Sequence, residues 1–123
     1  MAHFSNRSKL YLFTCHRDLQ LICNEAIKYY DFSVICGHRG EDAQLKAFKD
    51  GKSNRMWPAS YHNEDPSDAI DICPYPIDWN NINRFFELHG VILAVAGQLN
   101  IEIEWGGFWN SIKDYPHYQL KRK

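Results

Sequence analysis

Two histidines and two aspartates in this chain are of the types, and at the positions, that a hydrolytic metal site needs. His62 lies in the segment SYHNEDPSDAID (residues 60–71), which ends at Asp71, just before the apolar run ICPY. Near the other end of the chain, Asp114 precedes His117 by three positions. Two imidazoles and one carboxylate, with a fourth position left to water, are typical of a catalytic zinc ion rather than a structural one.

A second carboxylate beside such a ligand set can accept the proton of the attacking water. In this hypothesis His62, Asp71 and His117 hold the metal and Asp114 is the base. The spacing alone leaves another interpretation open. No H-E-x-x-H motif is present, and two histidines so far apart in the chain can be unrelated.

The remaining histidines and the cysteines favour structural roles. His89 lies in an amphipathic segment, which indicates a buried histidine with a hydrogen-bond partner, and His3 and His16 are expected at the surface. The absence of a C-x-x-C pair argues against a four-cysteine zinc site. In a reducing compartment we expect the four cysteines to be small residues of the core. These cysteines are Cys15, Cys23, Cys36 and Cys73.

The length and composition indicate one globular domain spanning residues 1–123, with no room for a second sizeable domain. The formal net charge is −1, with 14 basic and 15 acidic residues, so no strong field attracts nucleic acid or an anionic membrane. No apolar run approaches the length of a membrane span, and the N-terminus lacks the features of a signal peptide. We therefore expect no stable membrane insertion and a cytoplasmic location.

The elements that must position these side chains follow from periodicity and turn signals. The segments predict an α+β fold. There are more helices than a doubly wound sheet of this size needs, and helices and strands lie in separate regions of the chain. We expect a small antiparallel sheet that carries the metal site, packed with about three helices. The predicted order is helix 14–30 capped by Thr14, strand 31–36, helix 41–51, strand 69–75, helix 80–99, strand 101–105 and strand 117–120.

Six segments, spread over residues 14–120, resemble the phage L-alanyl-D-glutamate endopeptidases, which belong with the zinc D-Ala-D-Ala peptidases and the vancomycin-resistance dipeptidases. They are TCHRDLQ, NEAIKYYDFSVICGHRGEDAQ, KS, SYHNEDPSDAIDICPYPIDW, IEWGGFW and DYPHYQL. The wider signature of that family is S-x-H, then A-x-D, then a late acid-x-x-H. All three motifs are present here in the same order, so the resemblance covers nearly the whole chain.

The resemblance implies a role for each matching residue. One zinc ion per chain would be held by His62, Asp71 and His117. Asp114 matches the acid that serves first as general base and then as general acid. Arg39, in GHRGEDAQ, matches the arginine that holds a substrate carboxylate or the developing oxyanion, and Ser60 matches a serine that supports a ligand or contacts substrate.

Three departures from the family pattern concern the rim of the site rather than its ligands. The interval from His62 to Asp71 is longer than in the shortest members, and the segment 108–113 is short. Phe108 stands where relatives often have an acid. These differences bear on substrate specificity.

The function implied by the resemblance is that of an endolysin, a zinc peptidase that hydrolyses the L-Ala–D-Glu bond of bacterial peptidoglycan. We expect a monomer that waits in the host cytoplasm and reaches the wall through a holin or another release route. The alternatives are a D-Ala-D-Ala carboxypeptidase or another stem-peptide specificity, and a non-catalytic zinc-binding interaction module like the Hedgehog domains. Asp114 favours an enzyme over the interaction module.

Overall fold

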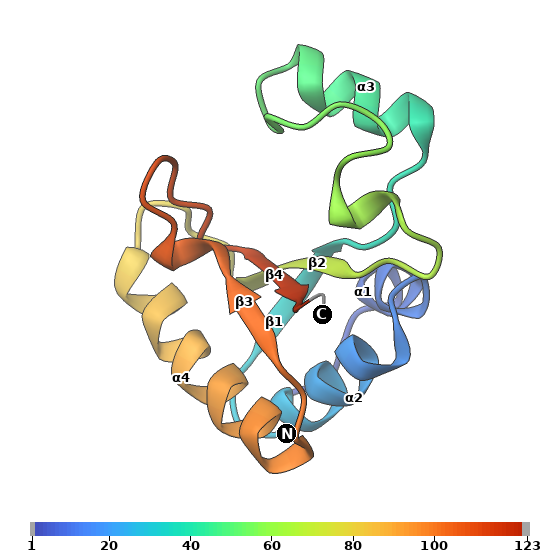
Figure 1. Cartoon of the computed structure of the whole chain (residues 1–123). Coiled ribbons are helices and arrows are strands. Elements are labelled where there is room, and N and C mark those ends of the chain that lie inside the picture. Colours follow the sequence, from blue (N-terminus) through green and yellow to red (C-terminus); the bar gives the residue numbers. More distant parts are fainter. Residues whose placement is uncertain (1, 122–123) are drawn as a thin grey trace.

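The computed structural model describes residues 2–121, which form one four-stranded sheet and four α-helices. In Figure 1, α2 and α4 lie on one side of the sheet, and α3 stands on the other side. The elements are α1 (Asn6–Phe13), α2 (Arg17–Ala26), β1 (Phe32–Cys36), α3 (Glu41–Lys49), the 3₁₀ turn η1 (Tyr61–Asn63), β2 (Ala69–Pro74), α4 (Ile82–Leu99), β3 (Ile103–Trp105), the 3₁₀ turn η2 (Gly106–Phe108) and β4 (His117–Leu120).

The predicted α+β class and the small antiparallel sheet are confirmed. The strand order is β1-β2-β4-β3, and each neighbouring pair is antiparallel. The last strand in the chain therefore lies between β2 and β3 (Figure 1). This order places Asp71 of β2 directly opposite His117 of β4.

A β-bulge interrupts the pairing of β1 with β2. Val34 lies opposite Ile72, but Cys36 lies opposite Asp71, so two residues of β1 advance the register by only one residue of β2. A bulge changes the direction of the strand and of its side chains, and such bulges are frequent beside functional sites. Here the bulge aligns Cys36 with Asp71 and His117 across three adjacent strands.

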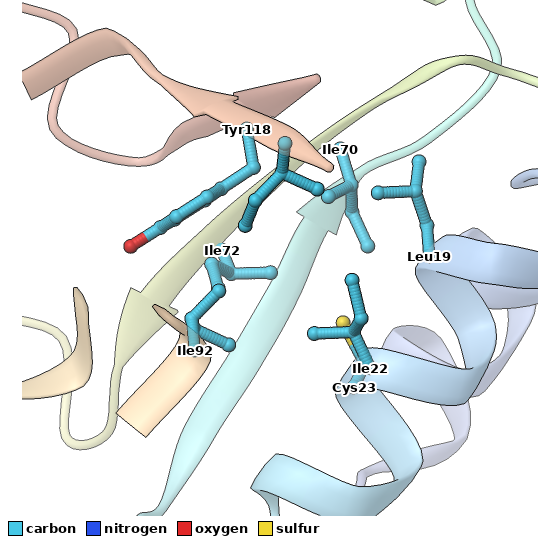
Figure 2. A pocket seen from close by; sticks show the side chains of 8 residues that line it. Leu19, Ile22, Cys23, Ile70, Ile72, Ile92 and Tyr118 are labelled. Carbon is cyan, nitrogen blue, oxygen red and sulfur yellow. The ribbon is translucent and has the colours of Figure 1, made fainter. Parts of the chain in front are cut away.

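The core lies between the sheet and the helices α2 and α4. Ile70 and Ile72 point toward Leu19 and Ile22 of α2 and Ile92 of α4 (Figure 2). Side chains alternate between the two faces of a strand, so Asp71, between these two isoleucines, faces away from the core. This alternation keeps one face of β2 apolar and leaves the other face for polar chemistry.

The N-terminal region differs from the prediction of one helix over 14–30. Residues 6–13 form a separate helix, α1, which contacts β1 and adds a fourth helix to the three expected. Thr14 is the C-cap of α1, and its hydroxyl donates to the Tyr11 carbonyl at 2.6 Å. The cap of α2 is instead His16, whose Nδ1 accepts from the Asp18 amide at 3.0 Å.

The later elements match the prediction closely. α4 begins at Ile82 and ends at Leu99, where Asn100 adopts a left-handed conformation with φ 57°. Cys15, Cys23 and Cys73 are buried core residues, as expected, whereas Cys36 is only partly buried. Within residues 2–121, no helix has the length and apolar character to cross a membrane.

Candidate metal centre and cleft

Three separate segments bring His62, Asp71 and His117 together on the polar face of the sheet. Asp71 Oδ1 lies 3.3 Å from His62 Nε2 and 3.2 Å from His117 Nδ1. The two imidazole rings meet edge to face, with their centroids 5.2 Å apart. The cross-strand pairing of Asp71 with His117 brings two of these three residues together, and the η1 turn adds His62.

A capping box fixes the η1 turn that carries His62. The Ser60 hydroxyl accepts from the His62 amide at 3.2 Å, and the Asn63 side chain accepts from the Ser60 amide at 3.0 Å. His62 Nδ1 donates to the Gly37 carbonyl at 2.8 Å, because a carbonyl oxygen can only accept. In the neutral ring this bond leaves the lone pair on Nε2, which faces Asp71.

A second set of hydrogen bonds orients His117. Gln119 Nε2 donates to Glu104 at 3.2 Å, which turns the Gln119 amide oxygen toward His117 Nε2 at 2.8 Å. His117 Nε2 is therefore the donor of that bond, and Nδ1 keeps the lone pair. Metal-ligating histidines almost always use their second nitrogen in this way. The donor set of two imidazole nitrogens and one carboxylate oxygen fits a divalent ion such as zinc.

The charges of this cluster shift the pKa of His62 and of Asp71. Burial by itself would lower the pKa of His62, but the Asp71 carboxylate outweighs burial and raises it to about 10. Burial would raise the pKa of Asp71, yet both histidines hold that pKa well below its usual range. His62 therefore carries a proton at neutral pH that a metal ion must displace.

Asp114 lies at the same cleft, in the loop before β4. Its amide donates to the Gly106 carbonyl at 3.0 Å, and its own carbonyl accepts from the His117 amide at 3.2 Å. Burial raises the pKa of Asp114, and the neighbouring Asp71 charge raises it further. A carboxyl group with a raised pKa beside a candidate metal site suits proton transfer.

Arg39 lies on the other side of Asp71. Its Nη2 is 3.9 Å from Asp71 Oδ2 and 3.7 Å from Cys36 Sγ, and its Nη1 donates to Gln44 at 3.0 Å. The 3.9 Å separation is too long for a hydrogen bond, so the guanidinium is held near Asp71 without being bonded to it. Arg39 thus keeps donor capacity for a ligand in the cleft.

These side chains line a cleft of about 520 Å³. All six residues that the sequence singled out for the site contribute to its wall, and so do two loops, 51–55 and 109–114. The lining residues are Arg39, Gly51, Lys52, Ser53, Asn54, Arg55, Ser60, Tyr61, His62, Asp71, Trp109, Ser111, Ile112, Asp114, His117 and Gln119.

Two residues at the centre of the cluster, Cys36 and Gln119, are not predicted from the sequence. Gln119 bonds to His117, and the i, i+2 spacing in the strand HYQL was a signal for it, because such residues share one face. Cys36, His62 and Asp71 offer ligand atoms that all lie within 4.8 Å of one another, so Cys36 belongs to a group that could hold a metal. The position of Cys36 depends on the bulge in β1, which no pattern in the sequence predicts.

His89 is a structural histidine, as predicted. It is buried, its Nδ1 lies 3.2 Å from the Tyr118 hydroxyl, and its ring stacks on Trp105 at 4.0 Å between centroids. Burial lowers its pKa. Phe108 packs edge-on against the rings of His89 and Trp105 and is not part of the cleft wall.

Comparison with known proteins shows which family the whole chain resembles. A family model described as phage L-alanyl-D-glutamate peptidase matches residues 1–123. The L-alanyl-D-glutamate peptidase of Escherichia phage T5 is 30% identical over 124 residues, which cover 97% of this chain and 89% of that relative. The crystal structure of the Serratia marcescens L-Ala D-Glu endopeptidase ChiX has a TM-score of 0.84 at 28% identity, with 98% of this chain and 90% of the other covered. From these matches, this chain belongs to the phage L-alanyl-D-glutamate peptidase family.

Proposed function

We propose that this protein is a zinc-dependent endolysin that hydrolyses the L-Ala–D-Glu bond of peptidoglycan stem peptides. The observation that carries the proposal is the convergence of His62 Nε2 and His117 Nδ1 on one oxygen of Asp71, at 3.3 and 3.2 Å. The family to which the chain belongs supplies the bond. In this proposal His62, Asp71 and His117 hold one zinc ion per chain.

Zinc bound there would supply Lewis acidity and a water whose pKa is lowered to about 7. Asp114 accepts the proton of the attacking water and returns it to the leaving amine. The raised pKa of its carboxyl group suits both directions of transfer. Arg39 stabilises the oxyanion or holds a substrate carboxylate, and Ser60 fixes the turn that carries His62.

The basic side of the cleft supports an acidic peptide as substrate. Lys52 and Arg55 join Arg39 on that side, whereas Trp109, Ser111 and Ile112 form a rim without charge. The D-Glu residue of a stem peptide carries a free carboxylate that such a cleft attracts. In this proposal the chain works as a monomer and as a single domain, and it is released from the host cytoplasm through a holin or a similar route.

Digestion of purified peptidoglycan, followed by mass spectrometry of the fragments, tests the proposal directly. We expect new N-termini at D-Glu, loss of cleavage with a chelator, and recovery on adding zinc. Fragments cut at D-Ala-D-Ala or at another stem-peptide bond would replace the proposed specificity. Binding without any cleavage, with or without zinc, would instead favour an interaction module.

A further inference from the structure

Gln44 lies at the centre of a buried polar network beside the cleft. It belongs to α3 and has no exposed surface. Its amide oxygen accepts from Arg39 Nη1 at 3.0 Å and from Asn63 Nδ2 at 3.1 Å. Its amide nitrogen donates to Ser53 Oγ at 3.0 Å and to the Arg55 carbonyl at 2.6 Å. A glutamine amide offers two acceptor and two donor positions, so this side chain uses all four.

The backbone of Arg39 is bonded to His62 and Asn63 rather than directly to Gln44. Its amide donates to the His62 carbonyl at 2.7 Å, and its carbonyl accepts from Asn63 Nδ2 at 3.0 Å. Gln44 therefore acts on the side chain of Arg39 rather than on its backbone. The other partners of the guanidinium within residues 2–121 are Cys36 Sγ and Asp71 Oδ2, both beyond 3.5 Å.

The opposite end of Gln44 holds the loop that forms the basic side of the cleft. Ser53 and Arg55 receive its two donor hydrogens, and both residues line the cleft. One buried side chain thus sets the position of the 51–55 loop and the direction of Arg39 together. A fully satisfied buried network of this kind is rigid, because any rearrangement leaves a polar group without a partner.

We propose that Gln44 is a positioning residue that aims the Arg39 guanidinium into the cleft and holds it 3.9 Å from the Asp71 carboxylate, beyond hydrogen-bond distance. Without the Gln44 oxygen, the guanidinium would turn to the Asp71 carboxylate, 3.9 Å away, and lose its direction toward substrate. The inference rests on the proposed function, because it acts through the role of Arg39 there. Gln44 thus acts on the proposed reaction from α3, without lining the cleft itself.

A double-mutant cycle with Arg39 tests this role. Gln44→Met has a similar length and no hydrogen bonds, so kcat/KM on peptidoglycan fragments should fall roughly ten- to hundredfold. In an Arg39→Ala background the same change should cost less than about threefold, because residues that act through one another are not additive. Fully additive losses would overturn the proposal.

A second variant and a matched control separate positioning from stability. Gln44→Glu keeps the acceptor for Arg39 but loses the two donors to Ser53 and Arg55, so kcat/KM should fall and still stay well above that of Arg39→Ala. A loss as large as that of Arg39→Ala would overturn the proposal, even if Gln44→Met does not fold. Ser8→Ala removes a buried polar group far from the cleft, the hydroxyl that accepts a hydrogen bond from the Val34 amide. This control should lower Tm without changing kcat/KM.

A readout without turnover distinguishes failure of this inference from failure of the proposed function. In ¹⁵N spectra of the native protein, the Arg39 Nη1–H signals should be protected from exchange with water, and Gln44→Met should abolish that protection. Equal protection in both proteins would overturn the inference. A native protein that cleaves no fragment, but shows this difference, would refute the proposed function and leave the role of Gln44 intact.

Discussion

Asp114 and His117 are close in the chain, but their replacement should have different effects. Asp114→Ala leaves the two imidazoles and Asp71 in place, so the protein should fold and keep its zinc. Removing a positioned base should lower kcat/KM by about 10²–10⁴-fold. His117→Ala removes a ligand and should lose metal and activity together. Metal content and kcat/KM, measured on the same samples, check both outcomes.

Two results would change the assignment of Asp114. Full activity in Asp114→Ala would remove it from the mechanism. Loss of zinc in that variant would make it a ligand and leave the base to be found.

The residues of the site were more predictable than the contacts between them. Ser60, His62, Asp71 and His117 stand in motifs of fixed spacing, and the structure brings them together. Cys36 was assigned to the core because nothing in DFSVIC indicates the extra residue of the bulge. A register shift depends on pairing with a distant strand, which local patterns do not contain.

At the scale of elements, Gly106 holds the Asp114 loop against the end of β3. A Cβ at Gly106 would collide with the Asp114 carbonyl oxygen and lie 2.9 Å from the Asp114 Cβ. Gly106→Ala should therefore displace the loop, lower kcat/KM at least tenfold and lower Tm, while zinc content stays near one per chain. Activity, thermal unfolding and metal analysis of the purified variant measure the three effects.

Gly97 provides the matched control in the same chain. It lies inside α4, and a Cβ there meets nothing within 4 Å. Gly97→Ala should stabilise the protein by about 0.5–1 kcal/mol and leave kcat/KM unchanged. If Gly106→Ala and Gly97→Ala have the same kcat/KM and Tm, the close contact of Gly106 with Asp114 does not determine activity or stability.

Elements with strong periodicity were predicted well, and α1 was not. α4 carries a long apolar stripe, so its bounds were correct to within two residues at the start. α1 exposes Leu10 and Phe13 while burying Ser8, which contradicts the usual burial pattern of an amphipathic helix. Thr14 was consequently assigned to the start of a helix, although it ends one. Tertiary contact with β1 stabilises α1, and that contact is invisible in the local sequence.

At the scale of the whole molecule, the metal-free protein should lose stability as the pH rises. The folded state raises the pKa of His62 from 6.5 to about 10, so it binds this proton more tightly than the unfolded chain. The resulting stabilisation is complete below pH 6.5 and is lost between pH 6.5 and about 10. Tm of the chelated protein across this range is the measurement.

Zinc should reverse this trend, because it takes the place of the proton on His62. The gain in Tm on adding zinc should grow with pH, and binding should release protons to the buffer. His62→Gln serves as the control, since its chelated form should lack the decline in Tm that His62 causes. If that decline is the same in both proteins, groups other than His62 cause it.

The strand order has a consequence for the protein while it is being made. β4 is the last strand to leave the ribosome, yet it must insert between β2 and β3, and it brings His117 with it. Before that insertion, a nascent chain has His62 and Asp71 but lacks His117. Without β4, the strands β2 and β3 are also not joined into one sheet. If His117 is the metal ligand proposed above, the chain becomes competent for hydrolysis only after translation has passed residue 117.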